Sequence, residues 1–485
     1  MADSTKRYVA VDLGASGGKV VLASVAGGKV TTETVHSFSI PCVTIAGQAY
    51  WDIYAAYSGV LEGLSAVGSR KVSVESIGVD AWVPGVVCMA SDGSFLNLPQ
   101  LGGDILSESY HSKFFRRMER RELYETTGVN VLDSHAALQL YGLRRSKSVA
   151  LEMAKNLLFI PDAMVYLLTG KRVCDYTSLY AAGLVDRGTK KLSRDVLSAC
   201  KVKARRFPSV VQQGSKPAKL TEEAAEATGL GRVPVVAGIG HGLASAAAAA
   251  APVSPVTPDS DKASLPGVFS SAEGTAFLLT GAVGVLGIET ASPIVNDQTF
   301  EMNFSNEAGV GGVNLLVKRI SGCDILDRCL KQWGMEGKSY SGEDIARMAL
   351  EGAETNAQLD PEDATLMSSS DMPAAIKRYC SLRSMSAPAD DAAVVRLIYS
   401  SLAEKIGNTF TKLQSVTPFR LKSLTVIGEE ALDPVLCQMV ADECAVPVTA
   451  GPADAAVLGN VLVQAGLTRA ALASSVTPVT YTPGL

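Results

Sequence analysis

The segment that decides the fold is residues 8–22, YVAVDLGASGGKVVL, near the start of the chain. An apolar run ends at Asp12, a glycine-rich turn follows over residues 14–18, and a second apolar run comes after it. Apolar runs of this length bounded by glycine are typical of strands joined by a tight turn. We therefore predict strands over residues 8–13 and 19–25, with a carboxylate and a glycine-rich turn between them.

The segments that follow extend this pattern to a layer of sheet and helix. A third strand is expected over residues 30–40. Apolar residues at helical spacing over residues 53–67 predict a helix, with Asp52 as its N-cap. Residues 76–82 then return as a buried strand. Three strands, a helix and a fourth strand predict the front half of a ribonuclease-H-like α/β layer.

A looser copy of this order occurs in the second half of the chain. Residues 277–288 can supply a strand pair and residues 394–413 a long helix, and two short strands precede a last helix. We predict one domain over residues 1–240 and another over residues 241–485. A stretch rich in Pro, Ser, Asp and Gly, about residues 252–271, predicts an exposed insertion in the second domain.

The composition favours a soluble protein with a small-molecule ligand. The 485 residues include 44 Lys and Arg against 49 Asp and Glu, which gives a net charge of -5. At roughly 100–200 residues per domain, this length predicts two large domains or more. The charge balance offers no basic surface to nucleic acid or to an anionic membrane, so we expect neither as a partner.

Cysteine and histidine usage predicts a reducing compartment and no zinc site. The nine cysteines are scattered without a C-x-x-C pair, and none of the four histidines has another His or Cys at zinc-ligand spacing. The start of the chain has neither a signal-peptide core nor an Arg-rich transit helix. The longest apolar stretch, residues 276–288, is too short to span a bilayer. We therefore predict a cytoplasmic protein.

The first candidate site is the glycine-rich turn itself. Gly14 and Gly17 let backbone N–H groups close around phosphate oxygens, and Ser16 and Lys19 add donors. Asp12 can hold a hydrated Mg²⁺. The alternative for this octapeptide alone is an ordinary hairpin turn with a capping aspartate.

Further short motifs cover nearly the whole chain in a fixed order. They are YVAVDLGASGGKVVL at 8–22, WD at 51–52, SIGVDAW at 76–82, PD at 161–162, LTGK at 168–171, DYT at 175–177, NE at 306–307, DPED at 360–363 and AGPADAAVLGN at 450–460. This series resembles the FGGY family of carbohydrate kinases, within the actin, hexokinase and Hsp70 superfold, and most closely its rhamnulokinase branch. The resemblance implies an α/β fold of two ribonuclease-H-like domains with a cleft between them.

The resemblance also implies a role for particular residues. The first domain would hold the sugar and the first phosphate loop, and the second the nucleotide. The implied positions are Trp51, Asp80, Trp82 and His241 for the sugar, Asp12, Gly14, Ser16, Gly17, Lys19 and Gly281 for phosphate, and Gly428 and Gly451 for the nucleotide. An active enzyme would use Mg-ATP, with Asp12 as the magnesium residue through water, whereas an inactive one would need no cofactor.

Several of these residues have a purely structural alternative. Trp51 and Trp82 could be core aromatic residues, and Asp80 could simply end a strand. For His241 we favour a satisfied buried imidazole, because its acidic neighbour is missing from the sequence.

The departures from the family pattern concentrate on the active site. Relatives carry a His-Asp pair whose aspartate removes the proton of the sugar hydroxyl, but here Gly242 follows His241. Such a base contributes roughly 10²–10⁴-fold to the rate. Four further segments lack family residues: VPG at 83–85, GGD at 102–104, TGAV at 280–283 and GEE at 428–430. The last puts two negative charges beside the adenosine position.

Two functions follow from this pattern. We predict a pseudokinase with lost or strongly reduced sugar phosphorylation, acting as a ligand sensor or a structural subunit. The alternative is an active ATP-dependent ketose kinase in which Asp80 or Asp104 replaces the base, because phosphoryl transfer depends mainly on positioning and charge. The expected partners are a sugar or nucleotide, with a protein partner or a second copy of the chain also open. A chaperone-like or filament-forming function has only the fold to support it.

Overall fold

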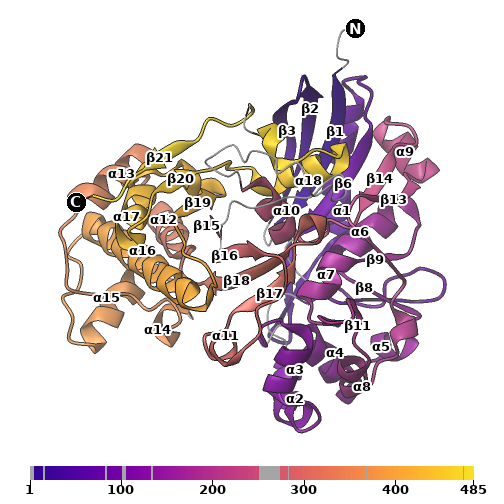
Figure 1. Ribbon diagram of the computed structural model, residues 1–485, viewed down its shortest axis with the longest axis horizontal. Coiled ribbons are helices and arrows are strands. Elements are labelled where there is room, and N and C mark those ends of the chain that lie inside the picture. The colour runs from indigo at the N-terminus through magenta and orange to yellow at the C-terminus, as the bar shows by residue number, and fades with distance from the viewer. Residues whose placement is uncertain are drawn as a thin grey trace.

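The computed structural model folds the chain into two lobes (Figure 1). It describes residues 5–14, 17–81, 85–100, 105–132, 135–250, 274–281, 283–367, 369–472 and 474–484. Ser16, Trp82, Asp104 and the predicted insertion at residues 252–271 lie outside the described residues. Within the described ranges, no helix combines the length and the apolar character needed to cross a membrane.

The main sheet of the N-terminal lobe has six strands: β1 (Lys6–Leu13), β2 (Gly17–Ala26), β3 (Lys29–Ser39), β6 (Ser76–Ala81), β13 (Ser215–Lys219) and β14 (Pro234–Ala237). Their order is β13-β14-β6-β1-β2-β3. The first three form an antiparallel meander, and β6 pairs with β1 in parallel. This is the arrangement predicted from the opening of the sequence.

Helix α1 (Ile53–Gly68) packs against β2 and β3. It begins where the sequence predicts, because the Asp52 side chain accepts hydrogen bonds from the backbone N–H groups of Tyr54 and Ala55. Buried apolar residues of α1, at helical spacing, join the core of this lobe.

A second part of the N-terminal lobe contains short helices and strands around its own apolar core. This core is formed by helices α2 (Ile105–Phe115), α3 (Arg120–Thr127), α4 (Ala136–Arg145), α5 (Val149–Met153), α7 (Tyr176–Ala181) and α8 (Arg194–Cys200). Helix α6 (Ile160–Thr169) contributes to this core and to that of the main sheet, whereas α9 (Glu222–Thr228) packs against α1 in the core of the main sheet. The strands of this part, with a hairpin near α1, are β4 (Cys42–Ile45), β5 (Gln48–Trp51), β7 (Val87–Met89), β8 (Asn156–Leu158), β9 (Val173–Asp175), β10 (Val185–Asp186), β11 (Lys191–Leu192) and β12 (Ser209–Val211).

The sheet of the C-terminal lobe repeats this topology. Its strands are β15 (Thr275–Leu279), β16 (Gly284–Thr290), β17 (Ser305–Ala308), β18 (Asn314–Ile320), β19 (Ser423–Ile427), β20 (Val448–Ala450) and β21 (Val479–Tyr481). β15, β16 and β18 form the antiparallel meander, and β19 and β20 continue from β15 in parallel. The two lobes are therefore two copies of one α/β architecture, as the sequence predicts.

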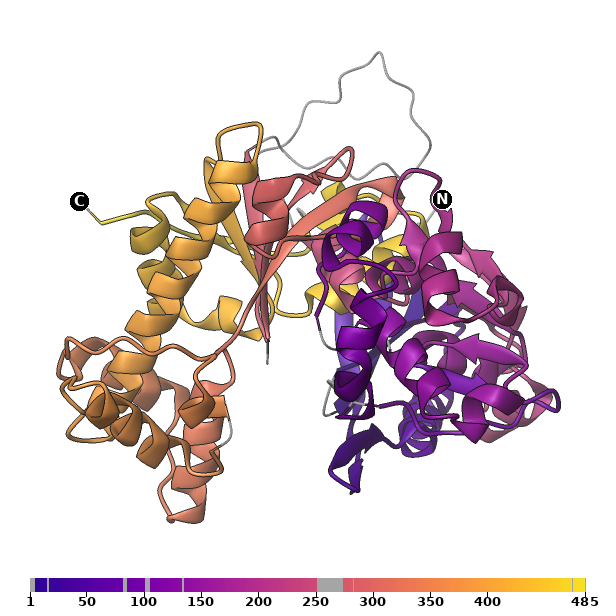
Figure 2. The ribbon, with the colours of Figure 1, turned by 90° about the horizontal axis from the view of Figure 1, so that it is seen from below.

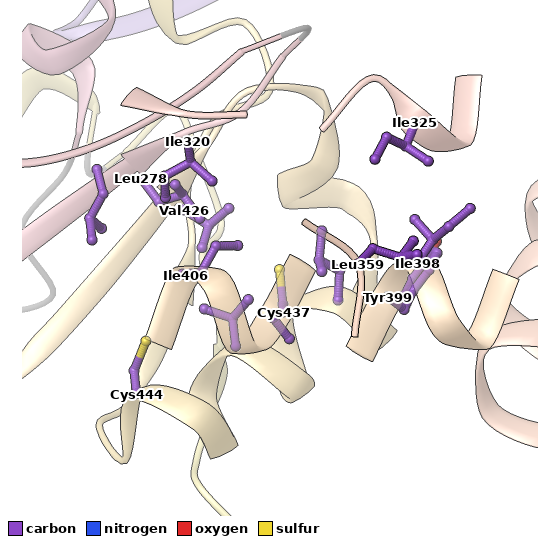
Figure 3. Packing of buried hydrophobic residues seen from close by; sticks show 14 of the residues in the cluster. Leu278, Ile320, Ile325, Leu359, Ile398, Tyr399, Ile406, Val426, Cys437 and Cys444 are labelled. Atoms are coloured by element: carbon purple, nitrogen blue, oxygen red, sulfur yellow. The ribbon is translucent and has the colours of Figure 1, made fainter. Parts of the chain in front are cut away.

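The helices of the C-terminal lobe are α11 (Asp297–Glu301), α12 (Ile325–Met335), α13 (Gly342–Glu351), α14 (Ala364–Met367), α15 (Met372–Leu382), α16 (Asp391–Val416) and α17 (Pro434–Cys444). In this lobe, α16 and α17 pack against the sheet, and α12, α13 and α15 pack on α16. Figure 2 shows the long orange α16 running through that lobe. The apolar faces of these helices enclose a core that includes Leu278, Ile398, Ile406 and Val426 (Figure 3).

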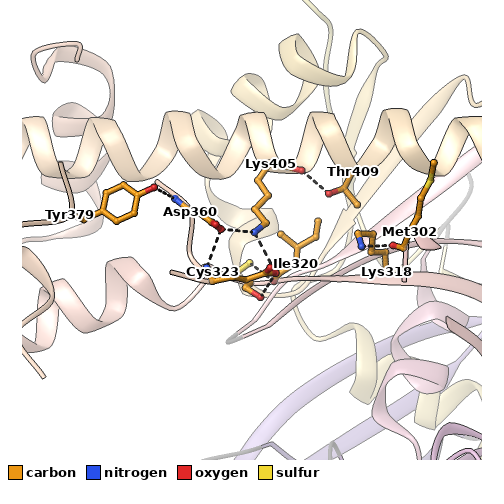
Figure 4. Close-up of polar contacts among 10 residues, drawn as sticks. Met302, Lys318, Ile320, Cys323, Asp360, Tyr379, Lys405 and Thr409 are labelled. Carbon is orange, nitrogen blue, oxygen red and sulfur yellow. Dashed lines mark hydrogen bonds and ion pairs between the residues drawn. The ribbon is translucent and has the colours of Figure 1, made fainter. Parts of the chain in front are cut away.

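The DPED motif at residues 360–363 has a structural role in this lobe. Lys405 of α16 places its ammonium 3.6 Å from Asp360 Oδ1 and 3.5 Å from Glu362 Oε1 (Figure 4). The backbone N–H of Asp360 donates to the hydroxyl of Tyr379 at 3.0 Å. The motif therefore fastens its loop to two helices.

Two helices join the lobes. α10 (Gly242–Ala249) follows β14, and α18 (Ala455–Ala465) comes from the far end of the chain, yet they pack side by side in a core shared with strands of both sheets. The approach is so close that a Cβ atom at Gly459 would lie 1.7 Å from the carbonyl oxygen of Ser245. Only glycine fits at this position, so α18 is held directly against α10.

Candidate active site

The glycine-rich turn lies at the end of β1, and its lysine is paired with the other lobe. The backbone N–H of Gly14 donates to the carbonyl of Gly17 at 2.8 Å. Lys19 Nζ lies 2.7 Å from Asp454 Oδ1, next to the start of α18, and 3.6 Å from Asp12 Oδ2. The ammonium that sequence analysis predicts for phosphate is therefore already neutralised by two carboxylates.

Asp12 and Asp80 lie side by side, because they are paired residues on the parallel strands β1 and β6. Asp80 is fully buried, and Asn460 of α18 donates to its Oδ2 at 2.7 Å. Its Oδ1 has no hydrogen-bond partner among the described residues. The Asp12 side chain is 21% exposed, so it is the more accessible of the two carboxyl groups.

The electrostatics of this carboxyl pair favour retention of a proton. Burial raises the pKa of Asp80 well above its usual range, and the neighbouring Asp12 raises it further. Burial also raises the pKa of Asp12, although Lys19 acts in the opposite direction. The pair therefore holds a proton to a higher pH than an isolated aspartate would.

Gly242 faces the unpartnered oxygen of this pair. A Cβ atom built at Gly242 would lie 3.4 Å from Asp80 Oδ1 and 3.5 Å from the carbonyl oxygen of Ala81. Asp80 is thus the carboxylate beside the position where relatives are expected to carry their base. A general base must be ionised and within reach of the hydroxyl proton, and burial opposes both for Asp80.

His241 is part of a separate buried chain of polar contacts. Its Nε2 lies 2.6 Å from Glu307 Oε2 of β17, and its backbone N–H donates to Thr177 Oγ1 at 3.2 Å. Thr177 Oγ1 in turn donates to Asp175 Oδ2 at 2.5 Å. Burial alone would raise the pKa of Glu307, but the hydrogen bond and charge of His241 outweigh it and the pKa is lowered.

Trp51 is fully enclosed in the core of the N-terminal lobe, and its backbone N–H donates to Pro99 O at 2.9 Å. This position corresponds to the core-packing alternative in the sequence analysis. Its predicted role in sugar binding stays a prediction.

The glycines of the C-terminal lobe shape two adjoining loops. Gly428 has a φ of +101°, and a Cβ there would lie 2.5 Å from Thr280 Oγ1, so the loop after β19 requires glycine. Gly281 has a φ of +151°. The backbone N–H of Gly451 donates to Val426 O at 2.6 Å. This bond holds the end of β20 next to the end of β19, where the Gly428 loop begins.

Two glutamates follow Gly428 at this edge. Glu429 is exposed, and its charge raises the pKa of Lys19 together with Asp12 and Asp454, although burial acts against this rise. Glu430 is half-buried, and its Oε2 has no hydrogen-bond partner among the described residues. Burial raises the pKa of Glu430. The loop therefore adds negative charge to the same interlobe region as the glycine-rich turn.

Comparison with known proteins agrees with this architecture. Residues 7–248 match the N-terminal domain of the FGGY family of carbohydrate kinases, and residues 277–467 match its C-terminal domain. The chain thus belongs to the FGGY family of carbohydrate kinases.

Within that family the chain is similar to rhamnulokinases. It is 34% identical to the rhamnulokinase of Bacteroides thetaiotaomicron over 460 residues, which cover 95% of this chain and 90% of that protein. It is 28% identical to the rhamnulokinase of Pectobacterium carotovorum over 94% of this chain and 87% of that protein.

Solved structures support the fold alone. Gluconate kinase from Lactobacillus acidophilus aligns with a TM-score of 0.76 at 15% identity, covering 99% of this chain and 94% of that chain. Plasmodium falciparum glycerol kinase with ADP aligns with a TM-score of 0.75 at 12% identity and the same coverage. These matches confirm the predicted two-domain fold.

Three residues of the site carried no individual role in the sequence analysis. Asp454 and Asn460 lie in the quoted motif at residues 450–460, and Glu307 lies in the motif at residues 306–307. The signal that could have identified these residues is their charged or amide side chain within a mostly small or apolar motif. The boundary near residue 240 stays a prediction.

Proposed function

We propose that this rhamnulokinase-like chain binds a sugar and a nucleotide but transfers phosphate slowly or not at all. Position 242 carries the proposal, because a glycine there offers no proton acceptor. The adjacent carboxyl, that of Asp80, is fully buried and its pKa is raised well above its usual range. A protonated carboxyl cannot accept the hydroxyl proton of a sugar.

Charge at the phosphate turn supports the same proposal. Lys19 is held between Asp12 and Asp454, and Glu429 adds a further negative charge nearby. An incoming polyphosphate would compete with these carboxylates for one ammonium. We therefore expect ATP to bind more weakly than about 1 mM, or about -4 kcal/mol.

The residues present can accommodate magnesium if ATP binds. Mg²⁺ is usually held by one or two carboxylates together with substrate phosphates and water. Asp12 is partly exposed, and it would hold the ion through water. The ion would neutralise charge on the transferred phosphate, while the Gly14–Gly17 turn would orient it and Lys19 would pair with its oxygens.

A coupled assay tests the proposal directly. We expect turnover at background with L-rhamnulose, L-fuculose, D-xylulose and glycerol at saturating Mg-ATP, alongside weak nucleotide binding by calorimetry with and without Mg²⁺. A kcat of order 1 s⁻¹, within the usual range of kinases, would overturn it. A role as a ligand sensor, or as a subunit with a protein partner or a second copy of the chain, would follow from binding without turnover.

One observation favours the alternative of an active kinase with a displaced base. Asp80 Oδ1 has no described partner and lies next to the position of the missing carboxylate. If Asp80 serves as the base, Asp80→Asn abolishes turnover, and kcat of the unmodified chain rises with pH as Asp80 ionises. Asp104, the other predicted substitute, lies outside the described residues, and Asp104→Asn is the matched test.

A further inference from the structure

A cavity of about 140 Å³ lies on the seam between the lobes. On one side it is lined by α7 and the segments around β10 and β12, and on the other by the turn from β17 to β18. None of the residues predicted for the active site lines it. We call it the seam cavity, and its lining includes Tyr180, Arg187, Lys190, Gln212 and Gln213.

The walls of the seam cavity are fixed relative to each other. Gln213 Nε2 of the N-terminal lobe donates to the carbonyl of Gly309 in the C-terminal lobe at 2.8 Å. Nearby, the His241–Glu307 contact also crosses the seam. A ligand would therefore enter a preformed space and would touch both lobes at once.

The charged residues that line the seam cavity are both cations. The Lys190 side chain is exposed and makes no hydrogen bond or ion pair with any residue in the described ranges. Arg187 Nε donates to the carbonyl of Glu125 at 2.7 Å, which holds the guanidinium in place. Its terminal NH₂ groups have no partner among the described residues, so a rigid fork of donors is left for another acceptor.

Tyr180 supplies an independent sign of a missing acceptor. The residue is only 4% exposed, and its hydroxyl has no hydrogen-bond partner among the described residues. Burial raises the pKa of this hydroxyl, so it remains a donor at neutral pH. A buried hydroxyl without a partner costs about 1–3 kcal/mol, and a bound acceptor would remove that cost.

The nearby carboxylates do not fill this role. Glu307 is bound to His241, and Asp186 Oδ1 accepts the backbone N–H groups of Gly188 and Thr189 at 3.1 and 2.7 Å. Both charged residues of the lining are cations, and the Tyr180 hydroxyl adds a donor, which is the chemistry that recognises an oxyanion.

We propose that the seam cavity binds a small phosphate-bearing ligand outside the active site. The guanidinium of Arg187, the ammonium of Lys190 and the hydroxyl of Tyr180 would contact the phosphate oxygens. The volume sets the size of the ligand, because pockets for drug-sized molecules measure roughly 300–1,000 Å³. Inorganic phosphate, or the phosphate end of a small ester, fits where a nucleotide does not.

Calorimetry of the full chain with sodium phosphate tests the site, with sodium chloride at matched ionic strength as the blank. We expect saturable binding that weakens at least about tenfold in Lys190→Ala and in Tyr180→Phe. Lys191→Ala is the matched control, because Lys191 is exposed, adjacent in sequence and absent from the lining. A parallel titration with glycerol 3-phosphate separates a free-anion site from one that prefers an ester.

Phosphate bound at the active-site turn is distinguished by Lys19→Ala. Binding that survives Lys19→Ala but is weakened by Lys190→Ala supports the seam cavity. Binding that is lost in Lys19→Ala and unchanged in Lys190→Ala overturns it, as does the absence of saturable binding up to about 10 mM phosphate, roughly -2.7 kcal/mol.

Discussion

Two buried polar groups join the lobes at the ends of neighbouring strands, and their electrostatics are opposite. Asp80, at the end of β6, is bound to Asn460 of α18 and lies beside a second carboxyl, Asp12. His241, just after β14, is bound to Glu307 of β17. The imidazole forms a hydrogen bond with its acid, whereas the two aspartates repel each other when both are ionised.

The difference separates a structural contact from a reactive one. Glu307 has a lowered pKa because its partner stabilises the charged form. Its Oε2 is hydrogen-bonded to His241 Nε2. Asp80 has a raised pKa, and its Oδ1 has no hydrogen-bond partner among the described residues. We infer that the His241–Glu307 contact holds the lobes together, while the Asp12–Asp80 pair keeps the capacity to accept a cation or a donor.

Breaking the His241–Glu307 contact should destabilise the protein more than any other substitution proposed below. Glu307→Ala should lower the free energy of unfolding by about 3–5 kcal/mol at pH 7, because it leaves a buried polar group without its partner. Urea denaturation measures this loss. Since the pKa of Glu307 is lowered on folding, its contribution is present above about pH 4.5 and is lost as pH falls through the folded value.

Glu301→Ala is the control for this variant, because Glu301 is an exposed residue at the end of the nearby helix α11. We expect the control to stay within about 0.5 kcal/mol of the parent. Equal effects of the two substitutions would show that the His241–Glu307 contact does not hold the lobes.

Adding a charge next to the Asp12–Asp80 pair should also lower stability. Gly242→Asp places a third carboxyl beside Asp80, at a position where a Cβ atom makes ordinary van der Waals contacts. We expect it to lower stability by about 1–3 kcal/mol at pH 8, with Gly242→Asn as the uncharged control.

The same variant tests whether the missing base alone limits catalysis. A positioned base would restore roughly 10²–10⁴-fold in rate. We expect no such recovery in a coupled ketose assay, because the neighbouring acids and Glu429 still oppose the bound phosphate. A large gain would show that the chain is a kinase lacking one group.

Removing charge from the pair should have a smaller effect, of opposite sign. Because the pKa of Asp80 is raised on folding, the folded chain loses stability as pH rises from about 4 through the folded value. Asp80→Asn carries no such proton. We expect it to be more stable than the parent at pH 8, by about 1 kcal/mol, and the difference to shrink toward pH 5.

Asp92→Asn is the control, because the pKa of Asp92 is lowered on folding whereas that of Asp80 is raised. Asp92 is exposed, and hydrogen bonds from Ser94 lower its pKa. Its contribution is therefore present above its unfolded pKa and is lost in acid. A stability curve for Asp80→Asn parallel to that of Asp92→Asn would contradict the raised pKa of Asp80.

The local elements of the fold could be predicted from the sequence, whereas the contacts between distant segments could not. Strand alternation, the Asp52 cap and the glycine-rich turn are local, so the fold of each lobe and the position of Asp12 followed from residue patterns. The contacts that define the site are not local: Asp80 meets Asn460 across 380 residues, and Lys19 meets Asp454 across 435. They depend on the packing of α18 against α10, which no local pattern encodes.

A weaker effect is expected from the acidic loop of the C-terminal lobe, residues 428–430, which adds negative charge near Lys19. Replacing Glu429 and Glu430 together by glycine should tighten ATP binding by roughly threefold to tenfold at low salt, with no gain in turnover. The gain is modest because Glu429 is exposed and solvent ions screen its charge within about 10 Å at 0.1 M salt. Calorimetry at two salt concentrations measures it, and Glu443→Gly, at an exposed site on α17, is the matched control for lost charge. Micromolar ATP binding by the unmodified chain would show that the two glutamates do not oppose the nucleotide, and that the electrostatic contrast between the two buried groups does not extend to this loop.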